Sequence, residues 1–474
     1  MVISVCEKLF ICYTSMGGRR NFLLVNMAVV LLNAGLGILV NLAAFTNRTG
    51  IRERYLTLPV DDGNLSMSNT PLAPGEIIVG AYGLLDISGN YSCHTFVWPA
   101  QDWTLITGES RICLTTQASV DRLFWVAWQA ESWSGPLSVS VFAPGTEFAV
   151  ASAMISYLRR CFPSVQERVS FHLVHTRSRP PLPTPHPHVH QLNCDDPEES
   201  NKILMGLRDE KEPKERRYPQ NLLRNLARRT CPCDYTLTID VDMLPVSFMA
   251  ENLTGFLNSI SAIPCKKCAY VVPVYELDNT VTYSPSDKME LLRLLLKGHA
   301  RRFHMKVYAR NQGNSHLESW EAEPGPDDTG AYKVMYNITT YEEFWEPILI
   351  LPYTAPLFDE RFIGYGFTRS SQVYELHRRG FKFQVLDQAF LTHRGFQTTS
   401  SYQPSRFAQI EINKVRYQMF KRDLHARLGL APPKAMIMPN LRQQLPLLIG
   451  RRSQASKPHA AIKGVPLRKD KKTN

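Results

Sequence analysis

Two aspartates at the end of a predicted strand are the residues best suited to chemistry. The run Tyr235–Asp240 (YTLTID) reads as a strand and leads directly into Asp240-Val241-Asp242. In an extended chain residues i and i+2 point to the same side, so both carboxylates are expected to face one point. Ligands of open α/β sheets bind at the carboxyl ends of strands. Paired carboxylates suit Mg²⁺ or Mn²⁺ bound to a diphosphate, and exchanging either one for asparagine is expected to abolish activity and leave folding intact.

Two further motifs supply titratable side chains. Asp359 and Glu360 are adjacent acids that precede a loop of glycines and aromatic residues, where an acid serves as a general base. The alternative is a helix N-terminus, where acids complement the helix dipole. His393 follows the β-rich run Ala389–Thr392 and is expected to face the same crevice as the aspartate pair. The alternative for His393 is a packed histidine of the core.

An amphipathic helix is predicted over Asn221–Arg229, just ahead of the aspartate strand. Asn221 and Arg224 on this helix are candidate contacts of a donor substrate. The competing interpretation places both on an ordinary solvated helix face.

Several function classes are excluded by missing motifs. The first predicted strand is not followed by Gly-x-Gly-x-x-Gly, and the chain has no Walker loop, no Gly-x-Ser-x-Gly and no His-Glu-x-x-His. These absences argue against a dinucleotide dehydrogenase, a P-loop kinase and an α/β-hydrolase. The net charge of +11 is concentrated in the last 25 residues, which carry +7 and leave +4 for the rest. A nucleic-acid-binding body is therefore not expected.

The elements that must position these residues alternate along the chain. Strands are predicted at Arg111–Thr116, Leu137–Ala143 and Arg168–Val174, with helices at Ser119–Ser132 and Thr146–Arg160 between them. Right-handed crossovers place such strands in one parallel sheet, so an α/β fold with a mostly parallel, Rossmann-like central sheet is expected. Residues 276–345 look irregular and aromatic.

The ends of the chain predict membrane attachment. Residues 22–45 form a run of 24 without a charge, long enough to cross a bilayer as a helix. A cleaved signal peptide and a buried core helix are the alternatives. The predicted organisation is a cytosolic tail (1–21), a transmembrane signal anchor (22–45), a stem (46–80), a catalytic domain (81–430) and a basic tail (431–474).

Sequons and cysteines favour a luminal body. Five Asn-x-Ser/Thr sequons follow the apolar run, at Asn47, Asn64, Asn90, Asn252 and Asn337. Eight cysteines also follow it, an even number that permits full pairing in an oxidising compartment. Cys231-x-Cys233 and Cys265-x-x-Cys268 have the alternative of binding zinc, although disulfides are favoured.

Long ordered motifs connect residues 80–427 to a known family. The stretches resemble the β-1,4-glucuronyltransferases of glycosyltransferase family 49 and the C-terminal domain of bifunctional xylosyl/glucuronyl transferases. They read TTQASVDRL, YPQNLLRNLAR, IDVDMLP, FDERFIGYGFTRSSQVYELH and VLDQAFLTHRGF.

This resemblance implies a GT-A fold, a single-pass type II topology in the Golgi membrane, UDP-glucuronate as donor and Mn²⁺ as cofactor. It further implies a xylose-containing O-mannosyl glycan of dystroglycan as acceptor and inversion at the donor's anomeric carbon. Asp240 and Asp242 match the family's Asp-x-Asp, and His393 matches a histidine that serves as a third metal ligand. Association with other glycosyltransferases is left open.

Two other functions remain at this point. A β-1,3-N-acetylglucosaminyltransferase on the same scaffold is the first, because basic residues are too plentiful to reveal a partner for the donor's carboxylate. A non-catalytic, lectin-like partner subunit is the second, although the intact motifs argue against it.

Overall fold

The computed structural model of the chain describes residues 84–86, 88–182, 191–208, 218–261, 265–323, 331–398 and 404–433. The predicted tail 1–21, anchor 22–45 and stem 46–80 lie outside these residues, as does all but the start of the basic tail. Within the described ranges, no helix combines the length and apolarity that a membrane crossing requires.

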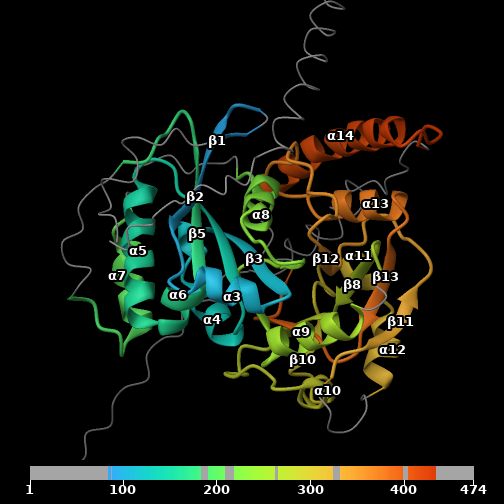
Figure 1. Ribbon diagram of the computed structural model, residues 1–474, viewed down its shortest axis with the longest axis horizontal. Helices are drawn as coiled ribbons and strands as arrows, with labels where there is room; N and C mark the ends of the chain where they lie inside the picture. The colour runs from blue at the N-terminus through green and yellow to red at the C-terminus, as the bar shows by residue number, and fades with distance from the viewer. Residues whose placement is uncertain are drawn as a thin grey trace, which may run out of the picture. The chain divides into compact units, whose positions relative to one another are not determined.

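Two β-sheets form the centre of the described unit (Figure 1). The larger sheet has the order β1-β2-β5-β4-β3-β6-β12-β8-β13-β11. Its strands are β1 (Leu84–Leu85), β2 (Tyr91–Trp98), β3 (Ile112–Ser119), β4 (Leu137–Phe142), β5 (Val169–Thr176), β6 (Tyr235–Thr238), β8 (Cys268–Val272), β11 (Val334–Ile338), β12 (Ile348–Pro352) and β13 (Lys382–Leu386). The smaller sheet, in the order β10-β9-β14-β7, contains β7 (Met243–Pro245), β9 (Val274–Leu277), β10 (Ala300–Arg302) and β14 (Leu391–Arg394).

Helices connect these strands along the whole chain. They are α3 (Trp103–Glu109), the 3-10 helix η1 (Val120–Arg122), α4 (Trp125–Ser132), α5 (Glu147–Cys161), α6 (Pro163–Arg168), α7 (Pro197–Gly206), α8 (Gln220–Arg229), α9 (Met249–Ser259), α10 (Lys288–Leu296), α11 (Arg310–Gly313), α12 (Leu317–Ala322), α13 (Ser370–Arg378) and α14 (Pro404–Arg427). The helix predicted over 119–132 is divided, because residues Leu123 and Phe124 separate η1 from α4.

The predicted parallel unit is confirmed for β3, β4 and β5. These strands pair in parallel, and every residue of β4 and β5 is buried, as expected for strands covered by helices on both faces. Successive side chains of β4 pack on opposite faces of the sheet. Val141 belongs to the main core together with α5, whereas Phe142 packs with Leu222 and Leu226 of α8. Figure 1 shows α5 and α8 on opposite sides of these strands. Each buried leucine of α8 stabilises this packing by about 1.5–3 kcal/mol.

The expectation of a mostly parallel sheet is wrong for the sheet as a whole. Its parallel pairings are β5–β4, β4–β3, β3–β6 and β8–β13, and the other five are antiparallel. Strand β12 causes the largest departure, because it enters between β6 and β8 and runs antiparallel to both. Ile350 lies opposite Leu237 on one side and Tyr270 on the other.

The segment 276–345 is more regular than its sequence indicates. It contains the end of β9 and the whole of α10, β10, α11, α12 and β11. Strand β10 pairs with β9, so that Arg301 lies opposite Glu276 at the edge of the smaller sheet. This segment therefore contributes to the surroundings of the aspartate turn described below.

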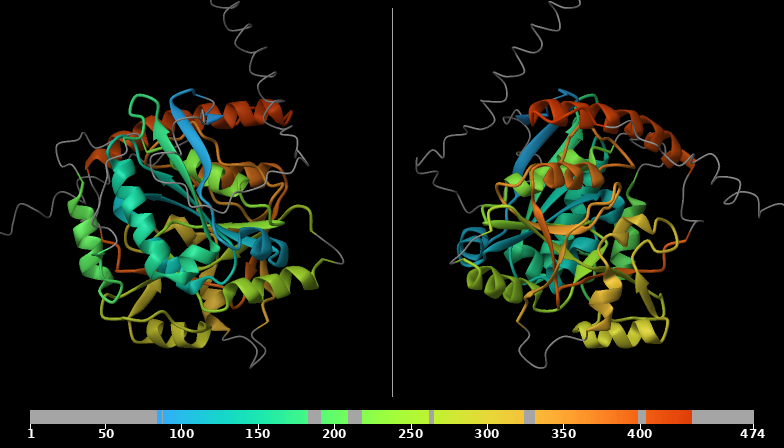
Figure 2. Two further views of the ribbon diagram at one scale, coloured as in Figure 1. Left: turned by 60° about the vertical axis from the view of Figure 1, so that its left-hand side comes forward. Right: turned by 90° about the vertical axis from the view of Figure 1, so that its right-hand side faces the viewer.

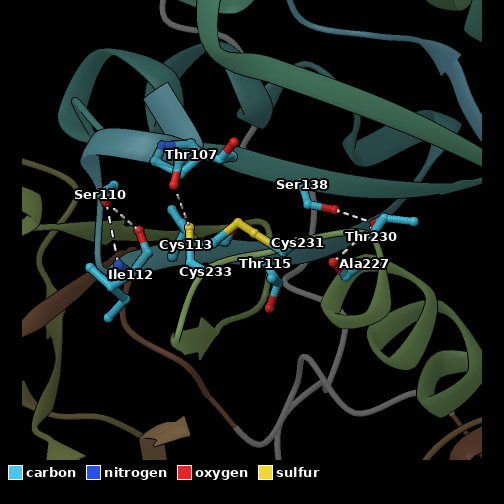
Figure 3. Close-up of a disulfide and its surroundings, with 12 residues drawn as sticks. Thr107, Ser110, Ile112, Cys113, Thr115, Ser138, Ala227, Thr230, Cys231 and Cys233 are labelled. Carbon is cyan, nitrogen blue, oxygen red and sulfur yellow. Dashed lines mark hydrogen bonds between the residues drawn. A yellow bond between two sulfur atoms is a disulfide. The ribbon is translucent and has the colours of Figure 1, made fainter. Parts of the chain in front are cut away.

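Three disulfides join the described cysteines, and Cys93 and Cys233 are buried thiols. Six of the eight cysteines after the apolar run are therefore paired, and zinc binding by the two predicted motifs is wrong. The pairs are Cys113–Cys231, Cys161–Cys194 and Cys265–Cys268. Figure 3 shows Cys231 bonded to Cys113 of β3 with Cys233 beside them. This bond ties the end of α8 to β3 and contributes about 2–4 kcal/mol of stability.

An aromatic cluster joins the C-terminal helices to the loop before α13. Helices α13 and α14 lie side by side (Figure 2), and Tyr374 and Tyr417 pack together between them. Asn413 of α14 donates through Nδ2 to the backbone oxygens of Ile363, Tyr365 and Gly366, at 3.0–3.1 Å. The glycine and aromatic loop is therefore held from the α14 side.

Candidate active site

The two aspartates lie in a turn rather than in an extended strand. Strand β6 ends at Thr238, and the turn at 240–243 is closed by a bond from the Met243 amide to the Asp240 oxygen, at 3.0 Å. Gln129 of α4 donates through Nε2 to the oxygens of Asp240 (3.1 Å) and Met243 (3.0 Å). The predicted position at a strand end is confirmed, but the i, i+2 geometry is wrong because the chain leaves one sheet here and enters the other.

Asp240 is fixed by two arginines from distant parts of the chain. Its Oδ1 accepts from Arg224 Nη2 at 2.8 Å and from Arg369 Nη2 at 3.1 Å. Burial alone would raise the pKa of Asp240, but the two opposing charges hold that pKa well below its usual range. Arg224 is only 2% exposed, so this carboxylate is the main counter-charge of a buried guanidinium.

Asp242 lies closest to His393. The Oδ2 atom of Asp242 is 3.6 Å from His393 Nε2 and 3.9 Å from Arg122 Nη1. The register of β14 against β7 explains this, because His393 lies directly opposite Met243, one residue beyond Asp242. Burial lowers the pKa of His393, but Asp242 and Glu276 outweigh burial, and the net shift is upward.

A buried carboxylate organises the other side of His393. Glu276 of β9 is fully buried and lies beside His393 in the parallel pairing of β9 with β14. Its Oε2 accepts from Arg301 Nε (2.6 Å) and from the Gln397 amide (3.0 Å). Its Oε1 accepts from the His304 amide at 2.8 Å. The Glu276 carboxylate therefore connects β10, the segment after β10 and the segment after β14.

Helix α8 holds the backbone of the loop before α13. Asn221 donates through Nδ2 to the oxygens of Asp359 (2.9 Å) and Thr368 (3.1 Å). Asn225 donates to the Phe358 oxygen and accepts from its amide, at 2.8 and 2.9 Å. Asn221 and Arg224 are therefore buried residues, which contradicts the solvated helix face. Arg224 contacts the aspartate turn directly, whereas Asn221 positions the loop.

The two acids of that loop are already paired. Asp359 accepts from Arg361 through both carboxylate oxygens, at 2.8–3.1 Å. Glu360 accepts from Asn225 Nδ2 at 2.8 Å and lies 3.5 Å from Arg229. Burial raises the pKa of Glu360 above its ordinary value. The helix N-terminus considered for these acids is not present, because α13 begins ten residues later.

The side-chain atoms around the aspartate turn that could ligate a divalent cation fit such an ion in part. Asp242 and His393 offer an oxygen and a nitrogen at 3.6 Å, and carboxylate with imidazole suits Mn²⁺. Asp240 keeps Oδ2 outside its two arginine bonds. Across the described ranges, however, no three His, Cys, Asp or Glu side chains are grouped closely enough to hold a metal. The residues therefore fit as a pair that needs further ligands.

Sequence reasoning missed four residues of this site: Gln129, Glu276, His304 and Arg369. Arg369 lies in FTRSSQ, which is part of the motif that resembles the family, and this motif could have identified Arg369 as a site residue. The other three carry no local signal, because each reaches the aspartate turn only through the pairing of distant elements.

The mixed α/β sheets and the acidic turn beyond a central strand define a glycosyltransferase-like fold. The chain belongs to the family described as glycosyl-transferase for dystroglycan, whose model matches residues 111–429. Over 368 residues the chain is 32% identical to beta-1,4-glucuronyltransferase 1 of Bos taurus and of Homo sapiens. These alignments span 74% of this chain and 82% of each relative.

More distant similarities exist. The xylosyl- and glucuronyltransferase LARGE2s of Gallus gallus is 23% identical over 365 residues, which cover 72% of this chain and 42% of that protein. A crystal structure of GalNAc-T7 with UDP, GalNAc and Mn²⁺ is 8% identical, with a TM-score of 0.33 over 71% of this chain and 54% of that one.

Proposed function

We propose that this protein is an inverting, Mn²⁺-dependent glucuronyltransferase of the GT-A fold in the Golgi membrane. Its donor is UDP-glucuronate, and its acceptor is a xylose-containing O-mannosyl glycan of the dystroglycan type. The observation that carries the proposal is the 32% identity with beta-1,4-glucuronyltransferase 1 across 74% of the chain. The catalytic domain is luminal, behind a single-pass type II anchor.

Asp242 and His393 would hold the cation together with Asp240, whose Oδ2 lies outside the two arginine bonds. When bound, such a cation supplies positive charge to the diphosphate leaving group. The buried Arg224 and Arg369 both bond Asp240, and the carboxylate of Glu346 also acts on these two guanidinium groups.

Transfer requires a general base that takes the proton of the acceptor hydroxyl. Asp359 or Glu360 stays the predicted base. Burial raises the pKa of Glu360, which favours this carboxylate as a proton acceptor. Either acid would first have to release its present partner, which is Arg361 for Asp359 and Asn225 for Glu360. Asn221 and Asn225 position both acids through the loop backbone.

The choice of donor separates the two enzymatic hypotheses. With a β-xyloside acceptor and Mn²⁺, UDP release should be at least tenfold faster from UDP-glucuronate than from UDP-N-acetylglucosamine, because a glucuronate pocket pairs the donor carboxylate with a cation. Losing that charged bond costs about 1.5–3 kcal/mol, roughly ten- to a hundredfold in rate. Faster UDP release from UDP-N-acetylglucosamine would favour an N-acetylglucosaminyltransferase over a glucuronyltransferase. If UDP release were equal from both donors and unaffected by EDTA, both enzymatic hypotheses would be excluded.

The luminal topology predicts an N-glycan at Asn337. This residue lies exposed on the edge strand β11, and its Oδ1 accepts from Gln384 Nε2 at 2.8 Å. Asn252 lies inside α9 and is expected to stay unmodified. Peptide mapping after endoglycosidase treatment of protein from a eukaryotic host should find the modification at Asn337, and Asn337→Gln should remove it. A modified Asn252 with an unmodified Asn337, or a chain without any glycan, would contradict this prediction.

A further inference from the structure

A glucuronate donor brings a carboxylate to the site in addition to its diphosphate, and this second anion needs a cationic partner. Three arginines near the aspartate turn are already bonded to carboxylates of the chain. Arg224 and Arg369 are buried and both donate to Asp240, at 2.8 and 3.1 Å. Arg301 donates to the buried Glu276 at 2.6 Å. Each of the three would have to give up a protein carboxylate before it could bind the donor.

Arg122 differs from these three arginines. Its side chain is 54% exposed, and its Nη1 lies 3.9 Å from Asp242 Oδ2, which is beyond hydrogen-bond distance. The same carboxylate oxygen also faces His393 Nε2, at 3.6 Å. Within the described part of the chain, the Arg122 guanidinium forms no hydrogen bond. Its N–H groups are therefore open to a ligand that reaches the turn.

The fold holds the backbone of Arg122 at the ligand-binding edge of the sheet. Strands β3 and β6 pair in parallel, so the segment after β3 and the aspartate turn after β6 leave the sheet at the same carboxyl edge. Within the segment after β3, Val120 and Leu123 are buried in the main core on either side of Arg122. The acid next to Arg122, Asp121, accepts from Ser119 Oγ at 2.6 Å. The backbone is thus anchored while the guanidinium stays exposed.

We infer that Arg122 binds the carboxylate of the donor sugar and thereby selects glucuronate among nucleotide sugars. This inference rests on the proposed function. A guanidinium presents two parallel N–H groups that match the two oxygens of a carboxylate. Such a pair would replace only the weak contact between Arg122 and Asp242, whereas the arginines bonded to Asp240 would lose a hydrogen-bonded partner. Arg122 is then a specificity-determining residue that takes no part in proton transfer.

The test compares donors that differ only in this carboxylate. UDP-glucuronate, UDP-glucose and UDP are each titrated into the full chain by calorimetry, with Mn²⁺ present and the acceptor absent. The wild type should bind UDP-glucuronate at least about tenfold more tightly than UDP-glucose, because a charged hydrogen bond is gained. In Arg122→Gln this ratio should fall close to one, with the affinities for UDP-glucose and UDP unchanged. Arg122→Lys retains the charge without the two parallel donors, so its ratio should lie between the two.

Arg111→Gln is the matched control for the loss of an arginine. Arg111 precedes β3 at the opposite end of the strand and pairs with Asp234 at 2.7 Å, so its loss should leave the donor ratio unchanged. The melting temperature of Arg122→Gln should equal that of the wild type, because the side chain is exposed and forms no hydrogen bond in the described structure.

Two results would overturn the inference. One is a wild-type donor ratio in folded Arg122→Gln. The other is an equal loss of affinity for UDP-glucuronate, UDP-glucose and UDP, which would assign Arg122 to the diphosphate. A wild-type chain that transfers no glucuronic acid from UDP-glucuronate to a β-xyloside would instead refute the proposed function.

Discussion

Asp242→Asn should reduce glucuronyl transfer by roughly 10²–10³-fold while the protein stays folded. The substitution removes a negative charge from the proposed cation site, where the metal supplies several kcal/mol of charge stabilisation. Folding is spared because the neighbours of Asp242 are not close, at 3.6 Å for His393 and 3.9 Å for Arg122. Initial rates at saturating donor, together with a thermal melt of the same preparation, measure both effects.

Asp234→Asn is the matched control for this experiment. Asp234 stands just before the same strand, its side chain is 61% exposed, and it pairs with Arg111 at 2.7 Å. An exposed ion pair contributes at most about 1 kcal/mol, so this variant should keep wild-type activity. An Asp242→Asn variant as active as the control would exclude Asp242 from the site.

Asp240→Asn should lower the free energy of unfolding by about 3 kcal/mol. Arg224 and Arg369 both donate to the Asp240 carboxylate, and the neutral amide would deprive two buried guanidinium groups of the carboxylate that they bond. These two bonds favour a different outcome for Asp240 than the sequence alone predicts, in that asparagine is expected to be tolerated at Asp242 but not at Asp240. Only Asp242 is a clean probe of chemistry.

Urea unfolding of Asp240→Asn, Asp242→Asn and Asp234→Asn in parallel measures this difference. We expect the midpoint of Asp240→Asn to fall clearly below those of the other two, with an unchanged slope. Equal midpoints for all three variants would show that the arginine bonds to Asp240 contribute little to folding.

The elements near the site follow from local patterns in the sequence. Strands β3, β4 and β5 are apolar runs separated by helical periodicity, and a right-handed parallel connection is nearly the only topology open to them. The aspartate pair was located for the same reason, because a β-rich run ends at Asp240. His393 was placed at the same crevice because it follows the β-rich run 389–392, and the resemblance of the segment LTHRGF then favoured a metal ligand over a packed core histidine.

The remaining features depend on contacts between distant residues. Strand β12 begins 110 residues after β6 ends, yet it pairs next to β6, and no local pattern announces an antiparallel insertion. Arg369 reaches Asp240 across 129 residues, and His304 reaches the turn only because β10 pairs with β9. Cys93 and Cys233 are a similar case, since an even count of cysteines does not reveal that these two are buried without a disulfide partner.

The structure of the reaction product tests the proposed function most directly. The full chain is incubated with UDP-glucuronate, a β-xyloside and Mn²⁺, and the product is analysed by mass spectrometry and by nuclear magnetic resonance of its anomeric proton. We predict a single added glucuronic acid in the β configuration, formed by the wild type and lost in EDTA and in Asp242→Asn. A product in the α configuration, or transfer of N-acetylglucosamine in place of glucuronic acid, would contradict the account.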